Sequence, residues 1–127
     1  MNYGEEYACW YLRLNGFFPI QNFVIHKSSQ VTHSSDCDIL AVRPPYVYEE
    51  IGGKQKDWDG LLINKLNFKC TIGVVCEVKT GNYDLNIFKP EYLRHSVGRL
   101  GFVDKAKIDK VTHELETSPI VDVNNQY

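Results

Sequence analysis

The chain has 127 residues, a mass of 14.7 kDa and a net charge of −2, with 43% hydrophobic and 24% charged residues. These values are typical of one globular domain and exclude disordered, collagen-like and coiled-coil proteins. The net charge also excludes a protein whose whole surface is basic, as in chains that bind nucleic acid over most of their surface.

The first element is predicted by apolar residues at helical spacing over 5–15, and Asn15-Gly16 supplies a stop. Trp10 of this helix is expected in the core. Runs rich in β-branched and aromatic residues predict strands, while Pro90 and Asp104 are placed to begin helices. In chain order, the prediction is a helix at 5–15, strands at 17–26, 36–42 and 71–79, helices at 90–100 and 104–116, and a short strand at 120–123.

An insert at 44–70 separates the second and third strands within a single domain, 1–127. Inserts of this length in a compact domain are usually functional or mobile. Side chains in it either contact a nucleic acid strand or belong to a plain solvated loop. These side chains are Lys54, Lys56, Trp58 and Lys65.

No apolar run approaches the roughly 18 residues that span a membrane. The first ten residues lack the basic and apolar regions of a secretory signal. The cysteines form no C-x-x-C pair and fit no common zinc motif. We therefore expect reduced, mostly buried thiols in a cytoplasmic protein; they are Cys9, Cys37, Cys70 and Cys76.

Acidic residues lie on two otherwise apolar strands. Alternation along a strand places Asp36 and Asp38 on one face and Cys37 on the other, and likewise places Glu77 and Lys79 together. Charges at such positions are costly unless they are paired or bound to a metal. If the strands pair, two carboxylates and one ammonium converge, which suits Mg²⁺. The alternative is an ordinary salt-bridge cluster.

This arrangement resembles the PD-(D/E)xK nuclease superfamily, which has the restriction-endonuclease-like fold. The matching residues are Asp38 at the start of DILAV and Glu77-Val78-Lys79 in GVVCEVKTG. The segment GEEYACWYLRLNGFF is also similar to the first helix of small Holliday-junction-resolvase-like nucleases. The resemblance covers about residues 4–81 and implies an α/β core, α-β-β-β-α-β, with a mixed sheet flanked by helices. Cys37 stands where the family name has proline, and the insert is longer than in compact resolvases.

The resemblance implies an endonuclease that hydrolyses phosphodiester bonds with Mg²⁺ or Mn²⁺, most readily in DNA, in defence, repair or recombination. Asp38 and Glu77 would be direct metal ligands, joined by the backbone carbonyl of Val78. Lys79 would position the attacking water or help to deprotonate it. Asp36 is placed for a supporting role.

In the same family, a first-helix glutamate reaches the site through a metal-bound water. Glu5 and Glu6 compete for this role, and helical spacing favours Glu5, which shares a face with apolar residues. Contacts to the nucleic acid would come from Thr80, Arg94 and Arg99. Tyr92, Arg94, His95 and Arg99 would form a helix face near the DNA backbone, for which a merely solvated surface is the alternative.

Two other functions stay open: a catalytically silent nucleic-acid-binding or dimerisation module of the same fold in a larger protein, and a small hydrolase acting on nucleotides in a closed pocket. Without Glu5, Asp36, Asp38 and Glu77, the remaining residues carry a net charge of +2. We therefore expect modest affinity for DNA. Target choice would then depend on a homodimer, on other subunits or on further domains of a longer chain.

Overall fold

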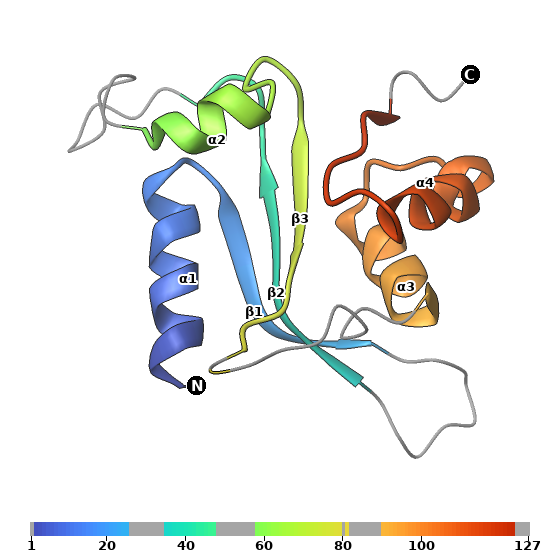
Figure 1. Ribbon diagram of the computed structural model, residues 1–127, viewed down its shortest axis with the longest axis horizontal. Coiled ribbons are helices and arrows are strands. Elements are labelled where there is room, and N and C mark those ends of the chain that lie inside the picture. The colour runs from blue at the N-terminus through green and yellow to red at the C-terminus, as the bar shows by residue number, and fades with distance from the viewer. Residues whose placement is uncertain (1, 26–34, 48–57, 80, 82–89, 124–127) are drawn as a thin grey trace.

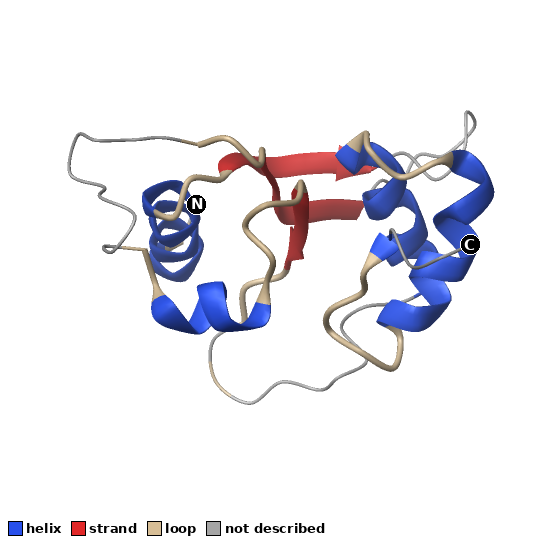
Figure 2. Cartoon of the chain, turned by 90° about the horizontal axis from the view of Figure 1, so that it is seen from above, coloured by secondary structure: helices blue, strands red, loops and turns tan. Residues whose placement is uncertain are grey.

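The computed structural model describes residues 2–25, 35–47, 58–79, 81 and 90–123 of the chain. In chain order, the elements are α1 (Tyr3–Leu14), β1 (Phe18–Ile25), β2 (Ser35–Arg43), α2 (Gly60–Lys65), β3 (Ile72–Cys76), α3 (Pro90–Leu100), a 3-10 helix η3 (Lys105–Lys107) and α4 (Ile108–Leu115). The sheet lies between α1 on one side and α3 and α4 on the other (Figure 1 and Figure 2). The predicted α/β class is therefore confirmed. None of these described helices is long and apolar enough to cross a membrane.

The three strands form one sheet with β2 in the centre. Both pairs are antiparallel, with Phe18 of β1 opposite Val42 of β2, and Ile39 of β2 opposite Cys76 of β3. A mixed sheet was expected, but in the described part of the chain the sheet is antiparallel throughout. The predicted helix, three strands and following helices are present in this order, with α2 added inside the insert.

The predicted strand at 120–123 is absent. Ile120 is 44% exposed, and the hydroxyl of Ser118 donates to its carbonyl at 2.9 Å. A short strand is stable only when it pairs with a sheet, and this segment pairs with no strand of the described sheet. The last element of the expected restriction-endonuclease-like order is therefore not found where the sequence predicted it.

Local signals set the two ends of α1. Asn2 and Glu5 form a capping box, in which the Asn2 side chain accepts from the Glu5 N–H at 2.8 Å. Asn15 ends the helix, and Gly16 follows with a φ of 88°, where a glycine has little steric cost. The inner face packs Cys9 and Leu12 against the sheet. Trp10 is 51% exposed, so its predicted place in the core is wrong.

The insert closes over the end of β2 that holds Arg43. Trp58, the first described residue after 47, is only 6% exposed and lies against Arg43 and Phe68. The prediction that Trp58 contacts a nucleic acid strand or belongs to a solvated loop is therefore corrected. Lys65 is exposed at the end of α2, while Lys54 and Lys56 lie outside the described residues.

The other face of the sheet packs against α3. Cys37, Leu40 and Tyr92 form its buried cluster, with Phe23, Val75 and Leu100 around them. Gly73 of β3 lies under the Phe102 ring, where an added Cβ would come within 2.6 Å. The helical layer therefore lies close to β3, directly above the strand that leads to Glu77.

Candidate functional site

Asp38 and Glu77 meet at the end of the ladder between β2 and β3. The last pair of this ladder joins Ile39 to Cys76, and the next step of the register brings Asp38 opposite Glu77. At this step, hydrogen bonds from backbone N–H groups to carboxylates take the place of backbone–backbone hydrogen bonds. The Asp38 N–H donates to Glu77 Oε1 at 3.4 Å, and the Val78 N–H donates to Asp38 Oδ2 at 2.8 Å. The strand predicted over 71–79 therefore ends at Cys76, because the next backbone donors turn to carboxylates.

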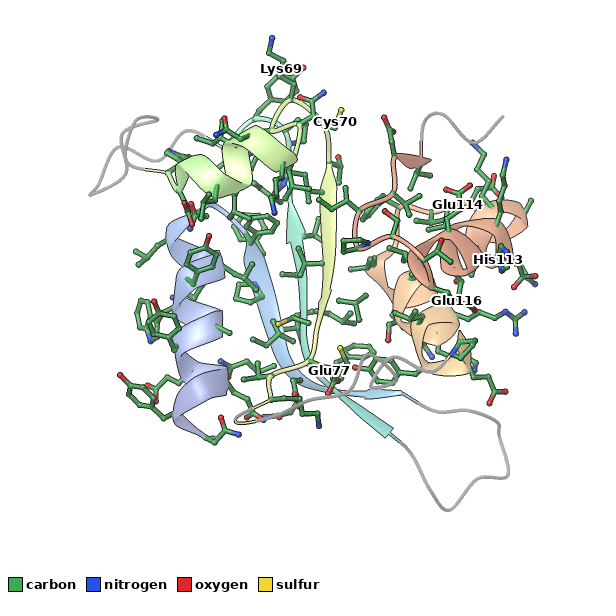
Figure 3. All side chains as sticks on the ribbon, viewed as in Figure 1. Lys69, Cys70, Glu77, His113, Glu114 and Glu116 are labelled. Carbon is green, nitrogen blue, oxygen red and sulfur yellow. The ribbon has the colours of Figure 1, made fainter. Side chains whose placement is uncertain are left out.

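Tyr92 of α3 holds the second carboxylate. Its hydroxyl donates to Glu77 Oε1, and Tyr92 itself is only 9% exposed. Figure 3 shows Glu77 beyond the end of β3, at the end of the sheet where α1 begins. Because Tyr92 is buried, its predicted place on a helix face near the DNA backbone is wrong. The sequence gave no signal that its hydroxyl would reach Glu77, fifteen residues away.

The regular alternation of β2 is interrupted at Asp38. Cys37 and Leu40, three residues apart, both pack on the α3 side of the sheet. Cys37 also forms a hydrogen bond with Tyr92, so it does not lie on the face away from Glu77 as predicted. The register places Asn22 of β1 opposite Asp38, and Asn22 has a φ of 53°. This left-handed residue inside a strand marks a distortion beside the site.

Burial raises the pKa of the Glu77 carboxyl above its ordinary value. The hydrogen bond from Tyr92 opposes this rise, while the charge of Asp38 and a hydrogen bond between the two carboxyl groups add to it. Among the described residues, neither carboxylate forms an ion pair with Lys, Arg or His. Two acidic groups are thus in contact without a described cation to neutralise them.

The two thiols next to the acid pair, Cys37 and Cys76, both have a raised pKa. Burial raises the pKa of Cys37, and burial followed by nearby negative charges raises the pKa of Cys76 to about 11. Both groups therefore stay protonated, and the thiolate is the reactive form. All four cysteines are free in the structure; Cys9 and Cys37 are buried, while Cys70 and Cys76 are half-buried.

The sequence also predicted Glu5 or Glu6, Lys79 and Asp36 at the site. Glu5 is half-buried, and its carboxylate accepts from the Asn2 N–H at 3.3 Å, which gives it a capping role at the start of α1. Glu6 is exposed, as is Lys79, two residues beyond Glu77. The Asp36 side chain lies outside the described part of the structure. The structure thus brings together Asp38, Glu77 and Val78, and the role of Glu5 at the site stays a prediction.

The residues proposed for nucleic acid contact are only partly described. Arg94 and Arg99 are exposed on α3, and Arg94 Nε lies 2.8 Å from Asp109 Oδ1 on α4. Thr80 lies outside the described residues. Surface ion pairs of this kind are weak and exchange readily, so Arg94 remains accessible to another anion.

The donor set near Asp38 is small. Within the described ranges, no group of three His, Cys, Asp or Glu side chains gathers closely enough to hold a metal ion. The oxygens that the described hydrogen bonds bring together are those of the two carboxylates and of the Tyr92 hydroxyl, while the role of the Val78 carbonyl stays a prediction. Comparison of the chain with protein-family models, with curated proteins and with solved structures found no match.

Proposed function

We propose that the chain is a metal-dependent nuclease that hydrolyses phosphodiester bonds in DNA, with its site at Asp38 and Glu77. The observation that carries this proposal is the contact between these two carboxylates, at the junction of β2 and β3, without a described counter-charge. The resemblance to PD-(D/E)xK nucleases in the sequence supports the same reaction. An ordinary salt-bridge cluster is disfavoured because the pair has no described basic partner.

A divalent cation fits the chemistry of the donor set. Mg²⁺ and Mn²⁺ prefer oxygen ligands, and Mg²⁺ is often held by one or two carboxylates while its other ligands are waters. The described backbone and tyrosine donors use Oδ2 of Asp38 and Oε1 of Glu77. The second oxygen of each carboxylate and the Val78 carbonyl would hold the ion. A cation there would also relieve the repulsion between the two acids.

The chain's own residues would then have distinct tasks. The Val78 N–H and Tyr92 hydroxyl fix the orientation of the two carboxylates before any ion arrives. Lys79, exposed beside the site, would bind a phosphate oxygen or orient the attacking water. A bound Mg²⁺ or Mn²⁺ would polarise the scissile phosphate and lower the pKa of its water.

The test is cleavage of supercoiled, linear, branched and single-stranded DNA with Mg²⁺ or Mn²⁺. We expect Asp38→Asn, Glu77→Gln and Lys79→Ala each to lower the rate at least about 100-fold. Asp104→Asn is the matched control. This residue is exposed, and asparagine can still cap η3 as Asp104 does now. The proposal would be contradicted if the wild type cleaved no substrate, or if the three variants cleaved DNA as fast as the wild type.

A second measurement separates the catalytic function from a silent binding module. We expect Mg²⁺ to raise the melting temperature of the wild type, because a ligand that binds only the folded state stabilises it. The Asp38→Asn variant should not respond. If the wild type binds DNA, shows no Mg²⁺ response and cleaves nothing, the module without catalysis is the correct interpretation.

A further inference from the structure

The outer face of α1 carries a continuous row of exposed apolar side chains. We call this row the α1 stripe; it consists of Tyr3 (84% exposed), Tyr7 (67%), Trp10 (51%) and Leu14 (70%). Its members are spaced by four, three and four residues, so they lie along one side of the helix.

The described part of the fold does not account for the α1 stripe. The opposite side of α1 already packs Cys9 and Leu12 into the core. A surface helix usually has one apolar face and a polar outer face. The helix lies on the outer flank of the sheet (Figure 1), and the three rings alone leave roughly 400 Å² exposed. A patch of this size on a small protein usually marks an interaction site.

We propose that the α1 stripe is the contact surface of a homodimer, in which two copies of α1 pack antiparallel about a two-fold axis. Spacing of four, three and four residues is that of the seam between two packed helices. With Leu14 included, two copies would bury about 1,000 Å² in total, the minimum for a specific interface. Such an area predicts a dimer that dissociates on dilution.

Charge complementarity selects the antiparallel arrangement. Glu6 and Arg13 are both exposed, each directly before a member of the α1 stripe, and they are seven residues apart on the same flank. In an antiparallel pair, Glu6 faces Arg13 of the partner subunit, and the two-fold axis repeats this pair. In a parallel pair, each Glu6 would lie level with the other Glu6 and each Arg13 with the other Arg13, so that like charges would be neighbours. The Arg13 guanidinium lies 4.6 Å from the centre of the Trp10 ring, which holds it beside the seam.

This inference is independent of the proposed nuclease function. The first test is the mass of the full chain by sedimentation equilibrium from about 1 to about 200 µM. We expect a transition from 14.7 kDa towards twice that value. Tryptophan emission gives a second signal, because Trp58 is buried already and only the exposed Trp10 should shift to shorter wavelength on association.

Variants identify the surface. Trp10→Ser should weaken association at least tenfold, while Leu61→Ser, which removes an apolar side chain that is also 70% exposed but lies on α2, should not change it. Circular dichroism and melting temperature confirm that both variants fold.

A charge exchange tests the orientation. Glu6→Arg and Arg13→Glu should each weaken association, and the double variant should recover it to within about threefold of the wild type. A chain that stays monomeric across the whole concentration range would overturn the proposal. A dimer that Trp10→Ser leaves intact would overturn it too, and a double variant that shows no recovery would overturn the antiparallel arrangement.

Discussion

Two charged groups on β2, only five residues apart, have contrasting surroundings. Arg43 is 3% exposed, its Nε donates to the Asn15 carbonyl at 2.9 Å, and its Nη1 donates to the Pro44 and Phe68 carbonyls. Its guanidinium also lies within 4.0 Å of the centres of two aromatic rings. Asp38 instead lies against a second acid, Glu77.

The contrast separates a structural charge from one that is available for function. Neutral carbonyls and ring faces surround Arg43, so it joins the insert to the rest of the domain. The acid pair receives hydrogen bonds from Val78 and Tyr92 but has no described cation. Charge left uncompensated in a partly buried place is typical of a ligand-binding site. Loss of Arg43 should therefore affect stability, and loss of Glu77 should affect activity.

The largest expected effect is on stability. Arg43→Met keeps a chain of similar length but leaves buried carbonyls without a donor, so the free energy of unfolding should fall by about 3 kcal/mol. Arg99→Met, at an exposed position, should change it by less than about 0.5 kcal/mol. Urea unfolding followed by circular dichroism measures both. Equal values for the two variants would remove the structural role assigned to Arg43.

The next effect tests the packing around Trp58, whose ring lies against Arg43. A Cβ at Gly16 would lie 2.8 Å from the Trp58 ring, and Gly16 has a φ of 88°. Gly16→Ala should lower the free energy of unfolding by about 2 kcal/mol. Gly101 has a φ of 89° with open space around it, so Gly101→Ala should cost only about 1 kcal/mol. The difference between them measures the contact with Trp58, and no difference would mean that the ring moves aside.

A third change compares two tyrosine–carboxylate pairs. Tyr92→Phe removes the donor to Glu77, and Tyr11→Phe removes the corresponding donor to Asp59 in the Arg43 region. We expect Tyr92→Phe to lower the rate of DNA cleavage about tenfold, while Tyr11→Phe leaves it unchanged. Because the Tyr92 hydrogen bond lowers the pKa of Glu77, its loss should move the acid limb of the pH–rate profile to higher pH. An unmoved limb would mean that Tyr92 does not act on Glu77.

The smallest effect concerns pH and stability. The folded pKa of Glu77 is raised above 4.5, so the folded state holds a proton more tightly than the unfolded state does. Stability from this group is present below pH 4.5 and is lost as the pH rises through the folded pKa. Without divalent ions, Glu77→Gln should therefore gain stability relative to the wild type as the pH rises, by less than about 1 kcal/mol. Melting temperatures from pH 4 to 8 measure this, with Mg²⁺ expected to reduce the difference.

Most of the described elements were predictable because their signals are local. Asn15 and Gly16 end α1, Pro90 begins α3, and Asp104 caps the 3-10 helix before α4. The strand at 120–123 was not predictable from its apolar residues, since a strand also needs a partner edge. Trp10 is exposed rather than buried because periodicity does not decide which of two apolar faces of α1 meets the sheet. Trp58 is buried because it packs against Arg43 and Phe68, and its contact with Arg43 joins residues distant in the sequence.

The sequence by itself determined the order of helices and strands and the presence of acids on two apolar strands, since periodicity and capping act over a few residues. Only the tertiary structure decided that Asp38 and Glu77 touch, because strand register depends on packing between segments 39 residues apart. It also decided that Tyr92 holds Glu77 and that the α1 stripe faces outward. These are long-range outcomes, fixed by which surfaces the core buries.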